Sequence, residues 1–357
     1  MQTQTHFRLL VVRLSAMGDI LHALPAVTAL RLAHPEWEIG WVVEPRWSAL
    51  LKTGGRDLGS GIGAEQPLVN RVHFAATKTW GKKPLSAQTL RAIMALRREL
   101  HATAYGAVLD LQGSIRSAVI ARLAGCRRVI GEAKPREAPA RWLFTERVET
   151  RGAHVIEQDV ELASAVAPDL DIDALKPAAP LLPVNPEAEA WCDALLAPAA
   201  RQPVALLNPG AGWGAKRWPA DRYAAVARGL VERGMAVLVN AGPGEETLAA
   251  EIRSATNGAA IPVTPSLGQL IALTRRIALC IAGDTGPLHL ACALGRPVVG
   301  IYGPTDPSRN GPYGARFVVL RSPLSRRDHR RRAAPEAGLL TIEPEEVLAA
   351  ADGLLGF

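Results

Sequence analysis

The sequence predicts an α/β protein with two domains, each built on a doubly wound parallel sheet. The chain has 357 residues, which exceeds what one compact hydrophobic core usually organises. Short apolar runs of strand character also alternate with longer segments of helical period through both halves. Two domains of about 150 to 180 residues each are therefore expected.

Strand and helix patterns alternate from the start of the first half. Phe7 to Leu14 reads as a buried strand, and a glycine-bearing loop leads from it into a helix from about Ile20 to Ala33. Further strands are expected at 38–43, 68–73 and 107–111, and further helices at 91–101 and 155–166. This alternation is typical of a parallel sheet covered by helices on both faces.

A proline-rich stretch then separates the halves. Asn185-Pro186-Glu187 supplies an N-cap, a first-turn proline and a first-turn acid for a helix that ends near Leu196. Strands are expected next at 204–207, 236–240, 261–264, 278–282 and 297–302. We assign residues 1–170 and 203–340 to the two domains, 171–202 to the linker and the first helix of the second domain, and 341–357 to a C-terminal helix packing back toward the first domain.

The charge balance suits an anionic partner. The formal net charge is +7 and the pI is near 9.5, which fits phosphates, nucleic acid or an acidic membrane surface. Nucleic acid is disfavoured, because there is no zinc-ligand spacing, no aromatic RNA-binding motif and only 5% aromatic residues. No secretory signal pattern and no apolar run of roughly 18 residues are present, so a cytoplasmic protein with at most peripheral membrane contact is expected.

The strongest site signal is the segment from Gly283 to Leu290, GDTGPLHL, which follows an apolar strand and opens a helix. Exposed amides at a helix start bind phosphate, so Thr285 and Gly286 are candidate donors to a diphosphate. Asp284 would repel a phosphate and is expected to order the loop or meet a sugar hydroxyl, while His289 can reach the same pocket. By itself this pattern equally fits an ordinary helix cap followed by a tight turn.

A second glycine-bearing loop, NPGAGWGAKRWP from Asn208 to Pro219, follows the first strand of the second domain. Lys216 offers a mobile ammonium to a leaving diphosphate, and the backbone at Ala211 and Gly212 allows close approach. Glu245, after the next strand, can accept hydrogen bonds from ribose hydroxyls or simply sit in a helix's first turn. The loop is not GxxxxGK[ST], because Arg217 follows Lys216, and no GxGxxG opens the first domain, which disfavours an ATPase or a classical NAD enzyme.

In the first domain, Asp19 stands at the opening of a helix expected to face the cleft between the domains. A carboxylate there can deprotonate an acceptor hydroxyl in an inverting glycosyl transfer, or it can be an ordinary N-cap. Cations in first-domain loops are candidate partners of an acidic acceptor, although solvated surface cations explain any one of them equally simply; they are Lys78, Lys82, Lys83, Arg116 and Arg136. The arginine run 326–332 is either a solvated loop or a docking patch for anionic lipid.

Three segments together, SAMGDILHALPA at 15–26, NPGAGWGAKRWP at 208–219 and GDTGPLHLACALGRPVVGIYGPTDP at 283–307, resemble the ADP-heptose lipopolysaccharide heptosyltransferases of glycosyltransferase family 9. The resemblance implies the GT-B fold, in which two Rossmann-like domains face a cleft and the C-terminal domain binds the donor. The 15–26 motif looks more like heptosyltransferase I, whereas the 208–216 loop is closer to heptosyltransferase II.

The resemblance also implies an activity: inverting, metal-independent and cofactor-free transfer of heptose from ADP-L-glycero-D-manno-heptose to the lipopolysaccharide inner core. The acceptor would be Kdo-lipid A or heptosyl-Kdo-lipid A, reached by peripheral contact with the inner leaflet of the cytoplasmic membrane. Asp19 matches the general base, Lys216 the diphosphate ligand, Glu245 the acid near the ribose, and Asp284 with Thr285, Gly286 and His289 the donor loop.

Two other classes of function remain open. A GT-B enzyme can use a different nucleotide sugar, either for another glycosyl transfer or for epimerisation. More distantly, the chain can be a non-catalytic protein that binds nucleic acid or a sugar nucleotide.

Overall fold

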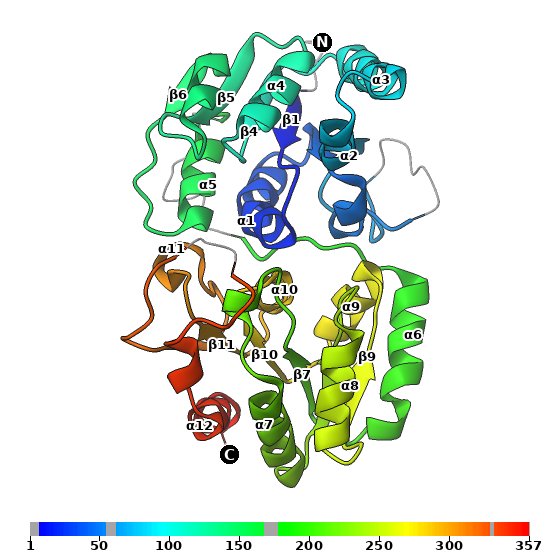
Figure 1. Ribbon diagram of the computed structural model, residues 1–357. Helices are drawn as coiled ribbons and strands as arrows, with labels where there is room; N and C mark the ends of the chain where they lie inside the picture. The colour runs from blue at the N-terminus through cyan, green and yellow to red at the C-terminus, as the bar shows by residue number, and fades with distance from the viewer. Residues whose placement is uncertain (1–6, 55–61, 168–177, 329–331, 357) are drawn as a thin grey trace. The chain divides into compact units, whose positions relative to one another are not determined.

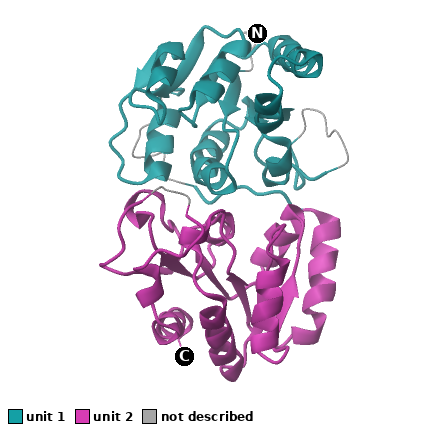
Figure 2. Ribbon diagram, viewed as in Figure 1, with its two compact units in different colours: residues 1–184 teal, residues 185–357 magenta. Residues whose placement is uncertain are grey.

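The computed structural model describes residues 7–54, 62–167, 178–328 and 332–356. The chain divides into two compact units, unit 1 (Met1–Val184) and unit 2 (Asn185–Phe357), coloured separately in Figure 2. The boundary falls inside the segment expected to be the linker. Residues 168–177, which include the first part of that segment, and residues 329–331 of the arginine run lie outside the described residues.

Unit 1 contains a six-stranded sheet in the order β3-β2-β1-β4-β5-β6, and every neighbouring pair is parallel. Its strands are β1 (Arg8–Val12), β2 (Glu38–Val43), β3 (Arg71–Phe74), β4 (Ala107–Asp110), β5 (Arg128–Glu132) and β6 (Glu146–Val148). The connecting helices are α1 (Met17–Ala33), η1 (Pro45–Leu50), α2 (Thr77–Lys82), α3 (Ala87–Thr103), α4 (Ile115–Leu123), η2 (Ala138–Leu143) and α5 (Val155–Ser164).

Unit 2 repeats this topology with the order β12-β11-β10-β7-β8-β9, again parallel throughout. Its strands are β7 (Val204–Asn208), β8 (Ala236–Asn240), β9 (Ala260–Val263), β10 (Leu279–Gly283), β11 (Val298–Tyr302) and β12 (Phe317–Arg321). Its helices are α6 (Pro186–Leu196), η3 (Ala197–Ala199), η4 (Gly214–Lys216), α7 (Ala220–Glu232), α8 (Glu246–Ala255), α9 (Leu267–Thr274), α10 (Gly286–Ala293), α11 (Pro307–Asn310), η5 (Leu339–Thr341) and α12 (Pro344–Leu355).

Helices cover both faces of each sheet (Figure 1), which explains why the central strands β1, β7 and β10 are apolar except for Arg8 at the start of β1 and Asn208 at the end of β7. In unit 1, Leu10 and Val12 of β1 pack in one core cluster with Leu96 and Leu100 of α3, while α1 and α5 pack together elsewhere in the unit. In unit 2, α7, α8 and α12 contribute to one core cluster with β7 and β8. Each sheet is therefore the middle layer of three.

Most expected elements are confirmed, with small shifts at their ends. The expected cap of α6 forms, because the Asn185 side chain accepts hydrogen bonds from the amides of Glu187 and Ala188. α1 begins at Met17, three residues earlier than expected. The C-terminal helix is α12, and it contacts α7, β11 and β12 in the core of unit 2.

No helix within the described residues is long and apolar enough to cross a membrane.

Candidate functional site

Both sheets have the strand order 3-2-1-4-5-6 when their strands are numbered from the start of each unit. In such sheets ligands bind beyond the carboxyl ends of the strands where the order reverses, between the first and fourth strands. In unit 2 this point lies between β7 and β10, and the loops that follow these strands contain Lys216 and Asp284. In unit 1 it lies between β1 and β4, and Asp19 follows β1.

The centre of the unit 2 site is a charged cluster. Lys216 Nζ lies 2.5 Å from Asp284 Oδ2, and His289 Nε2 lies 3.2 Å from Asp284 Oδ1. The Lys216 ammonium also stands 5.3 Å from the centre of the Trp213 ring. The backbone of Lys216 also runs close to Gly283, where a Cβ would lie 3.2 Å from the backbone oxygen of Lys216. The structure therefore joins Lys216 of one predicted loop to Asp284 and His289 of another.

Asp284 contacts both Lys216 and His289, and these neighbours keep its carboxyl group ionised. Burial alone would raise the pKa of the Asp284 carboxyl, but the hydrogen bond and charge of His289 and the ammonium of Lys216 outweigh burial and hold this pKa well below its ordinary value. With both carboxylate oxygens engaged, Asp284 orders the loop and orients Lys216. This arrangement agrees with the expectation that Asp284 is a loop residue.

Donor-loop residues next to Asp284 form the N-terminus of α10. Thr285 is the N-cap and Gly286 the first helical residue, and residues 284–287 are partly exposed between a buried strand and a buried helix segment. The helix start thus presents free amides and its partial positive charge at the end of β10. That is an arrangement suited to an anion such as a diphosphate.

Two asparagines that the sequence analysis did not select connect these loops. Asn208, at the end of β7, donates from Nδ2 to Thr285 Oγ1 at 3.3 Å and to the Gly210 carbonyl at 3.2 Å. Asn240, at the end of β8, donates from Nδ2 to Asn208 Oδ1 at 2.6 Å. Their position as the last residue of two neighbouring strands was the available signal, because a buried amide at a strand end needs polar partners.

Glu245 lies over the loop that follows β7. The amide of Gly242 donates to Glu245 Oε2 at 3.0 Å, and a Cβ on Gly210 would lie only 1.9 Å from the same oxygen. Glu245 is the cap residue before α8, but its side chain does not cap the helix. The carboxylate instead spans the ends of β7 and β8, as a ribose ligand in this fold would.

The remaining donor candidates, Ala211 and Gly212, lie in the same loop as Lys216. The Ala211 carbonyl accepts hydrogen bonds from Arg217 Nε and Nη2, which closes the loop, and Gly212 is exposed. Residues 332 and 336 form backbone hydrogen bonds with this loop: the Ala215 amide donates to the Arg332 carbonyl, and the Glu336 amide donates to the Ala215 carbonyl.

In unit 1, Asp19 lies in the first turn of α1, whose N-cap is Ala16. The Ala16 amide donates to Asp19 Oδ2 at 2.9 Å, and Arg13 Nη2 lies 3.5 Å from Oδ1. Asp19 is therefore not the N-cap, although it satisfies a backbone amide at the helix start. About a third of its side chain remains exposed, with a relative accessibility of 34%, so the carboxylate can reach a substrate.

A buried carboxyl near Asp19 escaped the sequence analysis. Asp159 of α5 is 2% exposed, and its Oδ2 makes no hydrogen bond to any other described residue. Burial raises the pKa of Asp159 to about 7; the charge of Arg13 opposes the shift, whereas Asp19 and Glu132 add to it. The sequence around Asp159 does not indicate that it lies near Asp19 and Arg13, because that proximity arises only when α5 packs on α1.

Two histidines stand near each other between the same two helices. His22 lies one turn after Asp19 on α1, and His154 is the N-cap of α5. Their rings meet edge to face with centres 5.6 Å apart. His22 belongs to the motif that contains Asp19, but the sequence analysis gave it no role.

A second polar turn follows β4, at the carboxyl end of the unit 1 sheet. Asp110 Oδ1 accepts hydrogen bonds from the amides of Gln112 and Gly113, both at 2.8 Å, and burial raises the pKa of Asp110 to about 6. Arg116 begins α4 just beyond this turn, and Arg136 follows β5 with its backbone against Gly113.

The structure thus brings Arg116 and Arg136, two of the five acceptor candidates, to the same turn. The other three, Lys78, Lys82 and Lys83, are exposed on and after α2, which follows β3 at the edge of the sheet. They lie two strands away from β1 in the sheet order.

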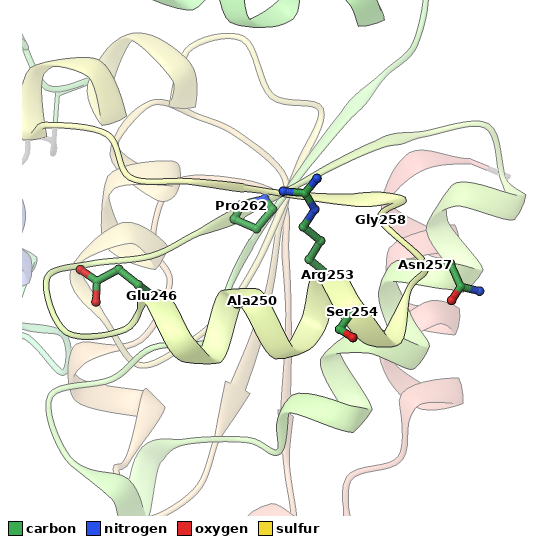
Figure 3. A pocket seen from close by; sticks show the side chains of 7 residues that line it. All are labelled: Glu246, Ala250, Arg253, Ser254, Asn257, Gly258 and Pro262. Atoms are coloured by element: carbon green, nitrogen blue, oxygen red, sulfur yellow. The ribbon is translucent and has the colours of Figure 1, made fainter.

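A hollow of about 630 Å³ lies along α8, and Figure 3 shows Glu246 and Asn257 near opposite ends of this helix. It is lined by residues of α8, the following turn and β9. Lys216, Glu245 and Asp284 are not among the lining residues, so this hollow is separate from the loops described above.

Comparisons with known proteins find relatives that align over most of the chain. Residues 93–339 match the family model for glycosyltransferase family 9 (heptosyltransferase). Lipopolysaccharide heptosyltransferase 1 of Pseudomonas aeruginosa is 30% identical over 88% of this chain and 84% of its own length.

Solved structures support the fold. Heptosyltransferase WaaC of E. coli, solved with ADP, superposes with a TM-score of 0.75 and 25% identity over 98% of this chain and all of its own. A glycosyl transferase family 9 protein of Veillonella parvula has a TM-score of 0.80 at 20% identity, over 99% of this chain and 98% of its own. The chain accordingly has the GT-B fold.

Proposed function

The chain belongs to glycosyltransferase family 9, the heptosyltransferases, and on that premise we propose that it transfers heptose from ADP-L-glycero-D-manno-heptose to the lipopolysaccharide inner core. The observation that carries the proposal is the Lys216–Asp284–His289 cluster beside the first turn of α10. Positive charge and free amides converge there at the end of β10, as a departing nucleoside diphosphate requires.

In the proposed reaction, unit 2 binds the donor. The amides at Thr285 and Gly286 and the ammonium of Lys216 receive the diphosphate, and Glu245 accepts hydrogen bonds from the ribose hydroxyls. As the bond from the anomeric carbon to ADP breaks, negative charge grows on the diphosphate, and Lys216 with the helix start stabilises it. Because these groups supply the positive charge, the proposed transfer uses no metal ion.

Unit 1 supplies the base. Asp19 takes the proton of the acceptor hydroxyl while that oxygen attacks the anomeric carbon on the face opposite ADP, which inverts the configuration. The hydrogen bond from the Ala16 amide and the nearby Arg13 hold the carboxylate in place. Arg116 and Arg136 are proposed to meet the acidic groups of the acceptor.

The proposed acceptor is Kdo-lipid A, because the relatives named lipopolysaccharide heptosyltransferase 1 align over 88% of the chain. A lipid-linked acceptor places the proposed enzyme on the cytoplasmic side, in peripheral contact with the inner leaflet. Heptosyl-Kdo-lipid A is the competing acceptor, suggested by the glycine-rich loop at 208–216.

The test is a transfer assay with ADP-heptose and Kdo-lipid A, run beside heptosyl-Kdo-lipid A and beside UDP-sugars, with and without a chelator. The proposal expects one heptose to be added to Kdo-lipid A from the ADP donor, at the same rate in chelator. Turnover of a UDP-sugar, or conversion of a nucleotide sugar without an acceptor, would instead favour another transferase or an epimerase. Donor binding without any turnover would indicate a sugar-nucleotide sensor.

A further inference from the structure

An unusual charge distribution marks the segment from β3 to Arg98 of α3; the first acid after it is Glu99, which contacts His73. Residues 67–98 contain seven lysines and arginines and no aspartate or glutamate. Arg71 pairs with Glu38, but the other six form no ion pair with any described residue; they are Lys78, Lys82, Lys83, Arg91, Arg97 and Arg98. A globular surface normally mixes both signs of charge, so this one carries an uncompensated positive field.

The same segment exposes large apolar side chains. Leu85, just before α3, is 87% exposed, and Leu90 and Met94 on α3 are each 50% exposed. Leu90 and Met94 are four residues apart and therefore adjacent on one face of the helix. Single exposed apolar residues are common, but three within ten residues form a patch.

Helical geometry places these two features on one surface. The buried face of α3 carries Leu96 and Leu100, which pack in the core of unit 1. At about 100° per residue, Leu90 and Met94 point away from that face. Arg91, Arg97 and Arg98 flank them on the same outward side. We call this surface the α3 face: Leu90, Arg91, Met94, Arg97 and Arg98.

From this combination we propose that the α3 face docks unit 1 onto the surface of an anionic lipid bilayer. Interfacial helices combine apolar side chains, which enter the boundary between headgroups and acyl chains, with flanking cations that meet lipid phosphates. The lysines on and just after α2 extend the positive surface toward the carboxyl edge of the sheet, where the proposed acceptor is bound. The inference rests on the proposed function only for the statement that the acceptor is a membrane lipid.

The α3 face fits this role better than the arginine run. Within the described part of that run, Arg332 pairs with Asp328 at 2.8 Å and Arg327 lies 3.9 Å from Asp306. Its charge is therefore partly compensated by acids, whereas that of the α3 face is not.

The test uses the full chain and co-sedimentation with two kinds of vesicle, phosphatidylcholine alone and phosphatidylcholine with about one-third phosphatidylglycerol. Each cation near an anionic surface strengthens binding roughly fivefold, so R91E/R98E should weaken binding to the anionic vesicles by at least about thirty-fold. L90S/M94S should weaken it by about tenfold. The matched control R127E/R147E changes the charge equally near the opposite edge of the sheet, at β5 and β6, and should bind like the wild type.

Circular dichroism and ADP affinity verify that each variant is folded, since ADP is expected to bind in unit 2. Equal vesicle binding by wild type and both α3 variants overturns the proposal. A loss in R91E/R98E with none in L90S/M94S also overturns it, because the face would then be a site for soluble polyanions such as nucleic acid.

An activity readout separates this inference from the proposed function. The α3 variants should transfer heptose normally to detergent-dispersed acceptor and poorly to acceptor embedded in anionic vesicles. Absence of heptosyl transfer by the wild type would refute the proposed function and leave the vesicle result standing.

Discussion

Breaking the contact between Lys216 and Asp284 should have a measurable and non-additive cost. The two charged atoms are 2.5 Å apart and each side chain is only about 15% exposed, at 15% and 14%. An exposed pair contributes about 0 to 1 kcal/mol, and loss of one partner of a fully buried pair costs about 3 to 5 kcal/mol. A charged hydrogen bond at this depth should therefore contribute roughly 2 kcal/mol.

The assay is a double-mutant cycle of K216A, D284N and the double variant, with the free energy of unfolding of unit 2 measured in urea. We expect a coupling energy of roughly 2 kcal/mol at neutral pH. The pKa of Asp284 is lowered in the folded protein, so its stabilising contribution is present above the unfolded pKa and is lost as the pH falls below about 4. Additivity of the single variants within about 0.5 kcal/mol at neutral pH would refute this reasoning.

The same variants test the ligand role of Lys216. K216A should weaken ADP binding by about 10- to 100-fold in calorimetry, because a cation that meets the diphosphate is lost. K216R keeps the charge and should retain more of the affinity. Equal ADP affinity in wild type and K216A would remove Lys216 from the donor site.

Three further predictions concern other parts of the two units. Asp19→Asn should lower kcat by about 100- to 10,000-fold while leaving the dissociation constant of ADP unchanged, because the base is lost and the donor site is not. Gly210→Ala should weaken ADP binding about tenfold or more, because the new Cβ would lie 1.9 Å from Glu245 Oε2 and must displace that carboxylate. The pKa of Asp159 is raised to about 7 in the folded protein, so its contribution to stability is present below about pH 4 and is lost as the pH rises toward 7. Urea titrations of the wild type at pH 5 and pH 8 should show this loss as about 2 to 4 kcal/mol of unfolding free energy, and Asp159→Asn should abolish it.

Controls distinguish these effects from general damage. Asp19→Glu keeps a carboxylate and should retain more activity than Asp19→Asn. Glu245→Gln should weaken ADP binding as Gly210→Ala does; a normal affinity in both variants would contradict the ribose role of Glu245. An unchanged pH profile of stability in Asp159→Asn would show that another group titrates.

The sequence was sufficient to predict most of the architecture, because buried parallel strands are short apolar runs and their helices have a different period. Among the elements it missed are β5, β6, β12 and α4. The run from Phe317 to Leu320 is apolar, so β12 could have been predicted; as an edge strand it is only half-buried, and Phe317 is 45% exposed. The first turn of α4 exposes Ile115 and buries Ser117, which disguises the helical pattern.

Part of the candidate site could be predicted from the sequence for a related reason. Lys216 and Asp284 stand at the carboxyl ends of predicted strands, and His289 lies one turn into the helix that follows Asp284. Parallel topology brings such strand ends together. Asp159 and Arg13 became neighbours of Asp19 through packing of α5 on α1, which no local pattern encodes. Amphipathic periodicity predicted a buried face for the helix in 341–357 without specifying its partner, and the structure packs α12 against α7, β11 and β12.

The central claim is an inverting transfer in which Asp19 of unit 1 acts on a donor held by unit 2. The most direct measurement is a crystal structure of the protein with a non-transferable ADP-heptose analogue. The account predicts the diphosphate at Lys216 and the α10 N-terminus, with the Asp19 carboxylate on the face of the anomeric carbon opposite ADP. A diphosphate bound away from Lys216, or Asp19 on the same face as ADP, would contradict it.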